Sequence, residues 1–277
     1  MLRTLVRRSA LAFLAASAAA LVSAGAAGAA DASWPDGDEV ARRVNAREDG
    51  QAVARTLVME LIERGGAART RVTRSFRRDF ADERRSVLFF QSPANLKGTA
   101  LLTWDDPDPA RDDAQWLYLP GLRKSRRVAM SERGRAFLGT DFTFEDMKNE
   151  TRLSRADYRW RTVGEEEVDG ARCLVVEALP VDERTARELG YGRILLRVDA
   201  ERWLPRLGEY WDPRGQPLKT VRLADVRAVQ GIWTPHRIEA ENLKTGHRTR
   251  LEFRDVDYAP ELPEDLFTEA ALARGAP

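Results

Sequence analysis

Four cations stand close together in the middle of the chain, between two segments rich in aromatic residues: Arg123, Lys124, Arg126 and Arg127. Guanidinium and ammonium groups gathered in this way can bind a lipid phosphate, an acidic membrane surface or an acidic partner protein. We therefore expect this basic cluster to lie at the rim of a binding site. There it would contact a headgroup or a partner.

Three acids follow in the same segment, Asp141, Glu145 and Asp146. They offer an alternative role for the cations, because isolated charges in a compact insertion would be costly to bury. Four bases against three acids leave at least one base free, so pairing and external binding are compatible. We place Asp141 at the same rim, or at the start of a short helix. Thr143 and Asp146 have capping-box spacing and predict a helix from Phe144 to about Asn149.

Large apolar side chains flank the basic cluster on both sides. They can line a cavity for acyl chains, since burial of each CH₂ group of a lipid tail contributes about 0.8 kcal/mol. The alternative is that each one is ordinary core packing. We predict a cavity lined by Trp104, Trp116, Tyr118, Leu119, Phe137, Phe142 and Phe144.

Catalytic patterns are sparse in this chain. His236 and His247 are its two histidines, and neither is accompanied by a nucleophile elbow or by metal-ligand spacing. Cys173 lies in a strand pattern and is expected to be a buried apolar filler. We therefore predict a protein without catalytic residues, metal or cofactor. A hydrolase that uses His236 as its base is the enzymatic alternative.

The first thirty residues have the pattern of a secretory signal peptide. Arg3, Arg7 and Arg8 precede an apolar stretch at residues 10–22, and small residues near position 30 suit cleavage. The pair Arg7-Arg8 leaves both the general secretory route and twin-arginine export open. We expect a periplasmic protein with one domain at residues 31–277, and no later apolar run has membrane-spanning length.

Charge argues against nucleic acid as a partner. Removal of the leader lowers the count of Lys and Arg from 45 to 42, while Asp and Glu stay at 44. The mature chain then carries a net charge of about −2. Binding to a phosphate backbone would need a basic excess instead.

Period-two alternation dominates the rest of the chain. Apolar residues alternate with charged ones in residues 193–199 and 247–258, which is typical of strands with one buried face. Turn signals divide the chain into roughly eleven or twelve such strands. An amphipathic helix capped by Asp36 and Glu39 precedes them, and residues 180–189 suit another short helix. We expect a mainly β fold, an antiparallel sheet curled into an incomplete barrel, with short helices as a lid.

Several stretches of the sequence resemble a known family. The run WLYLPGLRKSRRVAMSERGRAFLGTDFTFEDM at residues 116–147 is the most specific of them. Weaker matches are GRILLRVD at 192–199, GIWTP at 231–235 and PEDLF at 263–267. Together they resemble the periplasmic outer-membrane lipoprotein-sorting-like family, relatives of the LolA/LolB lipoprotein carriers, over roughly residues 38–272.

The resemblance implies an incomplete β-barrel with a helical lid and an apolar cavity for acyl chains. It also implies a gene of the kind often found beside genes for large lipid-exporting membrane transporters. The basic and aromatic insertion is absent from the best-studied lipoprotein carriers, so free lipid and lipoprotein both remain open as cargo. We expect a monomeric carrier that binds and releases acyl chains. The alternative is a non-catalytic accessory module that docks on a transporter. In either case the segment from Pro120 to Asp146 should cross the open mouth of the sheet.

Overall fold

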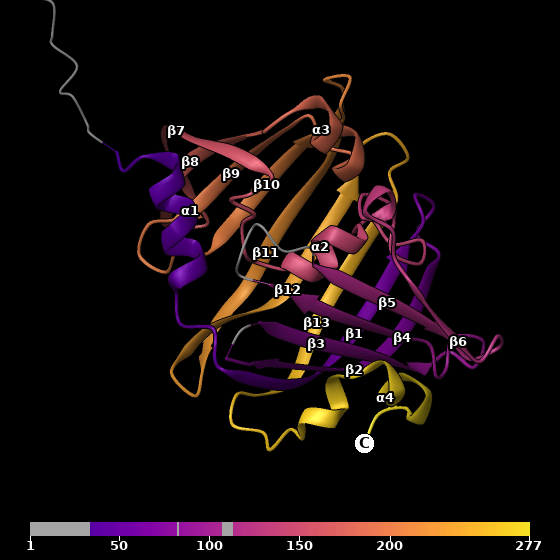
Figure 1. Ribbon diagram of the computed structural model, residues 1–277. Helices are drawn as coiled ribbons and strands as arrows, with labels where there is room; N and C mark the ends of the chain where they lie inside the picture. Colours follow the sequence, from indigo (N-terminus) through magenta and orange to yellow (C-terminus); the bar gives the residue numbers. More distant parts are fainter. Residues whose placement is uncertain (1–33, 82, 107–112) are drawn as a thin grey trace, which may run out of the picture. The chain divides into compact units, whose positions relative to one another are not determined.

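The computed structural model describes residues 34–81, 83–106 and 113–277, and the expected signal peptide lies outside them. Within this part of the chain a single antiparallel sheet contains thirteen strands (Figure 1). They are β1 (Ala52–Ile62), β2 (Ala68–Asp79), β3 (Arg84–Ser92), β4 (Ala100–Asp105), β5 (Ala114–Leu119), β6 (Lys124–Arg127), β7 (Tyr158–Val168), β8 (Ala171–Pro180), β9 (Arg193–Asp199), β10 (Pro205–Trp211), β11 (Pro217–Val229), β12 (Ile232–Asn242) and β13 (Arg248–Asp257).

Short helices accompany the sheet. They are α1 (Gly37–Ala46), η1 (Met130–Glu132), α2 (Phe144–Asn149), α3 (Glu183–Leu189), η2 (Glu264–Phe267) and α4 (Glu269–Arg274). The helix expected at Phe144–Asn149 is confirmed, as is a short helix within residues 180–189. No helix in the described residues has the length and apolar character needed to cross a membrane.

The two edge strands of the sheet are consecutive along the chain, although they lie at opposite ends of the strand order. The order is β6-β5-β4-β3-β2-β1-β13-β12-β11-β10-β9-β8-β7, so β6 and β7 form the two edges. These strands follow each other along the chain, and the connection between them must therefore run from one edge of the open sheet to the other. In Figure 1 this connection carries α2 across the middle of the sheet.

The predicted fold class, a mainly β incomplete barrel with short helices, is confirmed. The described residues hold one strand more than the eleven or twelve expected. The additional strand is β6, which lies inside the basic cluster and pairs with β5 from Trp116↔Arg127 to Leu119↔Lys124. Its sequence is KSRR. Because it contains no apolar residue, the alternation of apolar and polar residues could not predict this strand.

The inner face of the sheet is apolar and covered. Leu57 and Met59 of β1, Leu251 and Phe253 of β13 and their neighbours on β11 and β12 form one buried cluster. Phe137, Phe142 and Phe144 of the β6–β7 connection pack into the same cluster. The connection therefore buries the inner face that an unclosed sheet would leave in water.

Helix α1 covers the other end of the inner face. Val40, Ala41 and Val44 pack against residues of β7, β8 and β9, which confirms that this helix docks on the sheet. The expected capping box is wrong, because Asp36 makes no side-chain cap bond. Glu39 instead binds Arg42 and Arg43 one turn further on.

The outer face of β2, β3 and β4 is also buried, which the one-sided strand pattern did not predict. Phe76, Val87, Phe89 and Leu102 form a cluster there with Phe267 of the C-terminal segment and its neighbours. Figure 1 places η2 and α4 beside this part of the sheet. By contrast, alternation is kept on β9 as far as Val198 and on β13 as far as Phe253, where every second residue is buried as expected.

Candidate functional site

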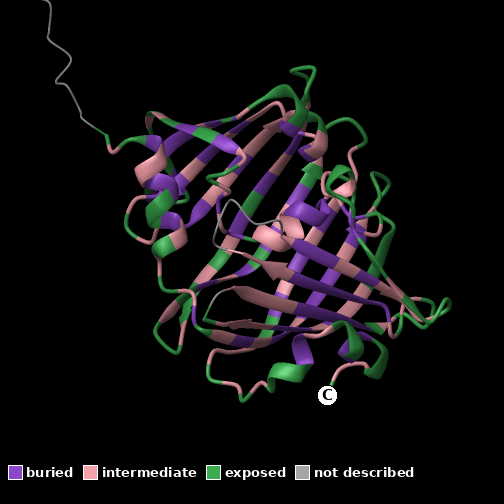
Figure 2. Ribbon diagram, in the orientation of Figure 1, coloured by how far each residue is buried: buried purple, intermediate pink, exposed green. Residues whose placement is uncertain are grey.

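The segment from Ala136 to Glu150, named the plug here, lies against the inner face and contains α2. Ala136 and Thr143 form an isolated antiparallel bridge that folds the segment into a tight loop. Thr143 caps α2, accepting a hydrogen bond from the Asp146 amide at 3.0 Å, and Asp146 accepts one from the Thr143 amide at 2.7 Å. This reciprocal pair is the capping box that the sequence predicts, and Figure 2 shows α2 partly buried and partly at intermediate exposure.

Asp146 is the central polar anchor of the plug. Its Oδ2 accepts hydrogen bonds from Lys219 Nζ of β11 and from the Tyr191 hydroxyl, each at 2.7 Å. The side chain of Lys219 is 4 % exposed, and its Nζ also donates to the Asp141 carbonyl at 2.8 Å. Burial, with the nearby Asp146 carboxylate, raises the pKa of Tyr191 well above its usual value. Tyr191 therefore acts as a neutral donor.

A second anchor joins the plug to β13 through Asp141. Its Oδ2 lies 2.6 Å from His247 Nδ1 and accepts a hydrogen bond from Thr249 Oγ1 at 2.7 Å. The Asp141 amide in turn donates to Thr249 Oγ1 at 2.9 Å. Asp141 thus holds the loop of the plug on the sheet.

Further ion pairs hold the C-terminal end of the plug. Glu150 pairs with Arg55 of β1, whose guanidinium lies 4.3 Å from the centre of the Phe253 ring. Lys148 pairs with Asp113 and with Glu145. Burial lowers the pKa of Lys148, but Glu145 and its acidic neighbours outweigh it, so the pKa lies above its usual value.

An apolar cavity remains between the plug and the sheet. Its lining residues are mostly apolar, namely Leu57, Phe142, Met147, Val221, Ile238, Leu251 and Phe253, and Asp146, Glu150 and Tyr210 complete the lining. Its volume is about 40 Å³. A single water needs roughly 10–15 Å³ and ligand pockets run to roughly 300–1,000 Å³. The cavity therefore holds no acyl chain while the plug occupies its place.

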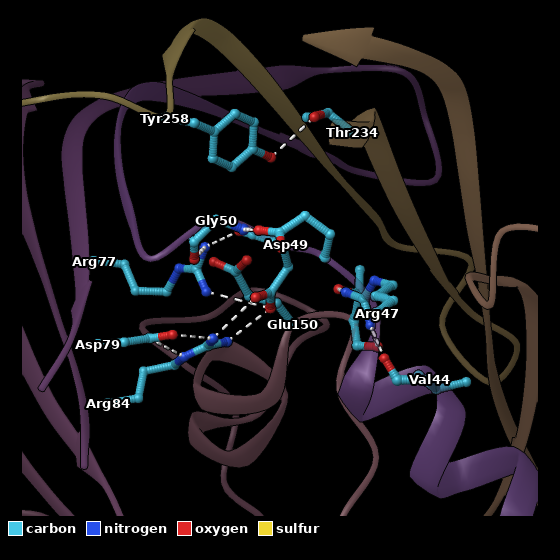
Figure 3. Close-up of polar contacts among 12 residues, drawn as sticks. Val44, Arg47, Asp49, Gly50, Arg77, Asp79, Arg84, Glu150, Thr234 and Tyr258 are labelled. Atoms are coloured by element: carbon cyan, nitrogen blue, oxygen red, sulfur yellow. Dashed lines mark hydrogen bonds and ion pairs between the residues drawn. The ribbon is translucent and has the colours of Figure 1, made fainter. Parts of the chain in front are cut away.

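A polar pocket of about 50 Å³ adjoins the apolar cavity and shares Glu150, Ile238 and Phe253 with it. Its walls are rich in arginine (Figure 3). Arg84 binds both carboxylate oxygens of Asp49, at 2.8 and 3.0 Å. Burial would raise the pKa of Asp49, but Arg84 and its neighbouring arginines hold it well below its usual value.

The structure divides the seven predicted cavity residues between the two faces of the sheet. Phe137, Phe142 and Phe144 lie in the inner cluster, and Leu119 packs against it. Of the seven, Phe142 alone lines the apolar cavity in the described residues. The other three pack against the outer cluster under the C-terminal segment, namely Trp104, Trp116 and Tyr118.

The basic cluster lies on the hairpin of β5 and β6, at a sheet edge. Arg123, Lys124, Arg126 and Arg127 are all exposed, and Figure 2 shows this hairpin tip in green. Arg126 pairs with Glu132 at 2.7 Å. The expected pairing with Asp141, Glu145 and Asp146 is wrong, because those acids bind partners elsewhere on the inner face.

The two histidines contact oxygen atoms of the protein, and the cysteine is buried. His236 is buried with Nδ1 at 3.1 Å from the Thr234 carbonyl oxygen, and His247 contacts Asp141. Cys173 is fully buried, and burial raises the pKa of its thiol to about 11. Among the described residues, no cluster of His, Cys, Asp and Glu is arranged to hold a metal ion.

Three anchoring residues were not predicted from the sequence, Arg55, Tyr191 and Lys219. Each is distant along the chain from the plug residue that it binds. Lys219 interrupts the buried face of β11, between Pro217 and Val221. A lysine at a position that alternation assigns to the core is a signal of a buried partner.

Solved structures with the same architecture are known. An outer-membrane lipoprotein-sorting protein domain from Vibrio parahaemolyticus matches with a TM-score of 0.77 and 27% identity, over 86% of this chain and 98% of that one. A DUF1329 family protein from Desulfovibrio piger matches at 0.76 and 26%, over 84% and 96%. A family model described as "Uncharacterized protein" matches residues 82–274. The chain belongs to the outer-membrane lipoprotein-sorting-like family.

The fold of this family extends to more distant proteins. A LolA superfamily protein from Nitrosomonas europaea is 20% identical and matches with a TM-score of 0.65, over 86% of this chain and all of that one. A comparison with curated proteins gives no match. The chain therefore has a lipoprotein-sorting, carrier-like fold, as the resemblance implied.

Proposed function

We propose that the protein is a periplasmic carrier that shields the acyl chains of a lipoprotein or lipid on their way toward the outer membrane. In this proposal residues 1–30 are a cleaved signal peptide and residues 31–277 form one half-barrel domain that acts as a monomer. The observation that carries the proposal is the apolar cavity between the plug and the inner face of an unclosed sheet.

Displacement of the plug supplies the room that an acyl chain needs. Phe142, Phe144 and Met147 cover apolar side chains of β1 and β11–β13 that a lipid tail could cover instead. Burial of about ten methylene groups contributes roughly 8 kcal/mol. This gain offsets contacts that the plug would give up on leaving the inner face.

The plug is suited to such an exchange because polar anchors hold it. Asp146, Asp141 and Glu150 bind side chains of β11, β13 and β1, at positions spread around the cavity. Water can replace these partners once the plug leaves. The plug can then close again without covalent chemistry, which matches a cycle of binding and release.

Lipid binding is tested with the mature protein purified from membrane-free periplasm. We expect native mass spectrometry or an organic extract to show bound lipid, and a fluorescent fatty acyl probe to be taken up with saturation. A protein that carries no lipid and takes up no probe would refute the carrier function.

A second candidate function is docking on a lipid-exporting membrane transporter, and the β5–β6 hairpin favours it. Leu122 at its tip is 67 % exposed and stands beside the exposed basic cluster. An apolar residue flanked by cations suits contact with an acidic partner or an anionic membrane surface. The two functions are compatible, because the hairpin lies at a sheet edge and its residues do not line the apolar cavity.

Charge reversal separates the two functions. We expect Arg126→Glu with Arg127→Glu to abolish transporter binding in a pull-down at physiological salt, because both side chains are exposed at the hairpin. Uptake of the acyl probe should stay within twofold of the original protein. The matched control is Arg184→Glu with Arg187→Glu, two exposed arginines on α3. Loss of probe uptake with intact docking would contradict this division of roles.

A further inference from the structure

The polar pocket beside the apolar cavity contains more arginine than its acids balance. Arg84 has two carboxylate partners, Asp49 and Asp79. Arg77 lies 3.3 Å from the same Asp49, so one carboxylate serves two guanidinium groups. Lys148 also reaches the pocket, but its own acids, Asp105, Asp113 and Glu145, satisfy it. The imbalance therefore lies among the arginines.

Arg47 is the clearest case of a buried cation that makes no direct ion pair among its described contacts, although the charge of Asp49 acts on it from further away. Its guanidinium donates only to neutral oxygens of Val44 and Thr151 among its described hydrogen bonds. Its Nε is buried and has no hydrogen-bond partner. Burial lowers the pKa of Arg47 to about 10, and the nearby charge of Asp49 offsets this effect only in part. A buried charge of this kind is costly unless an anion completes the site.

Arg55 provides a second incomplete cation at the boundary of the two cavities. It is 8 % exposed, and its Nε is also buried without a partner. Its remaining charged contact is Glu150, which belongs to the plug. The Glu150 carboxylate therefore occupies the place of an anion, and it leaves that place if the plug is displaced.

We propose that this arginine pocket binds the phosphate of an anionic lipid headgroup while the acyl chains of the same molecule occupy the adjoining apolar cavity. Guanidinium groups bind phosphate oxygens in pairs, with a geometry that an ammonium group lacks. The volume of about 50 Å³ has room for roughly four waters, a number comparable with the oxygens of one phosphate. The shared wall of Ile238 and Phe253 lets one amphiphile reach both sites.

The proposal rests on the carrier function and makes it specific. Dihexanoyl phosphatidic acid, dihexanoylglycerol and inorganic phosphate are titrated separately into the mature protein by isothermal calorimetry. We expect the anionic lipid to bind at least tenfold more tightly than dihexanoylglycerol, which lacks the phosphate, with the difference shrinking at high salt. Inorganic phosphate should bind at least tenfold more weakly than the anionic lipid and compete with it.

Two variants test whether the preference for the anionic lipid arises in the arginine pocket. Arg47→Gln should lower the affinity for the anionic lipid about tenfold and leave the affinity for dihexanoylglycerol unchanged. Glu150→Gln should raise the affinity for the anionic lipid, because it removes the competing carboxylate. The control is Arg135→Gln, whose side chain is 72 % exposed and lies outside the pocket.

The outcomes separate this proposal from the carrier function. Equal affinity of the original protein for both lipids would overturn the headgroup site while leaving acyl binding intact, and this measurement needs no variant. Binding of inorganic phosphate as tight as that of the anionic lipid would assign the pocket to the free anion instead. Absence of binding by both lipids and by a neutral acyl probe would refute the carrier function itself.

Discussion

Replacement of Asp146 by alanine is expected to destabilise the protein by about 3–5 kcal/mol. The reason is that Lys219, with its side chain 4 % exposed, would keep a buried charge after losing its carboxylate partner. The variant also loses the capping box of α2 and the acceptor for the Tyr191 hydroxyl. Urea unfolding, followed by intrinsic fluorescence, measures the loss as a lower midpoint.

The control for this variant is Asp182→Ala. Asp182 caps α3 by accepting the Thr185 amide at 2.7 Å, but it holds no buried cation among its described contacts. Its loss should cost only about 1 kcal/mol. The double variant Asp146→Ala with Lys219→Met should recover much of the stability, since no unpaired charge remains. Equal losses for Asp146→Ala and Asp182→Ala would contradict the role of Asp146 as the main anchor.

The variant Asp146→Ala also tests whether the plug moves during uptake. If polar anchors hold the plug against the inner face, Asp146→Ala should increase the rate of acyl probe uptake even while it lowers stability. Asp182→Ala should leave the uptake rate unchanged. A slower uptake in folded Asp146→Ala protein would show that the plug must stay in place for binding.

Replacement of Phe267 by alanine is the second change with a large expected effect. Phe267 is fully buried, stacks edge-on against Phe80 at 5.7 Å and accepts a hydrogen bond from Trp104 Nε1 through its carbonyl. Truncation of a buried phenylalanine costs about 3–5 kcal/mol. Because Phe267 lies on the outer face, we expect uptake of the acyl probe to remain unchanged in protein kept below its unfolding temperature.

Phe137→Ala is the matched variant on the inner face. Phe137 is also fully buried, and it packs against Phe144 of the plug with ring centres 5.5 Å apart. It should lose a similar amount of stability and alter probe uptake as well. Thermal unfolding and uptake measured on both variants would decide the point. A loss of uptake in Phe267→Ala alone would place the lipid site on the outer face.

Local patterns were sufficient to predict much of this fold. Strands follow from alternation and turn residues, and α2 follows from the spacing of Thr143 and Asp146, because those signals act over a few residues. The partners of the plug could not be predicted in this way. Lys219 and Arg55 reach it only through the order of the strands, which no local pattern specifies.

The sequence of β5 already indicated that its aromatic residues lie on the opposite face of the sheet from its leucines, and the prediction did not use this pattern. Trp116 and Tyr118 alternate with Leu117 and Leu119 along β5, and successive residues of a strand point to opposite faces. Leu117 and Leu119 lie on the inner side, so the two aromatic residues had to lie outside. The cover over them could not be inferred, because η2 and α4 come from the far end of the chain.

The pairing of β1 with β13 has a consequence for how the protein reaches its native state. These strands join the two halves of the sheet at its centre, with Leu57 opposite Phe253 and Met59 opposite Leu251. The halves cannot associate until nearly the whole chain has been made, and contacts of such long sequence separation slow folding. We therefore expect folding on the time scale of milliseconds to seconds, with an unpaired β1 edge that a chaperone could protect from aggregation.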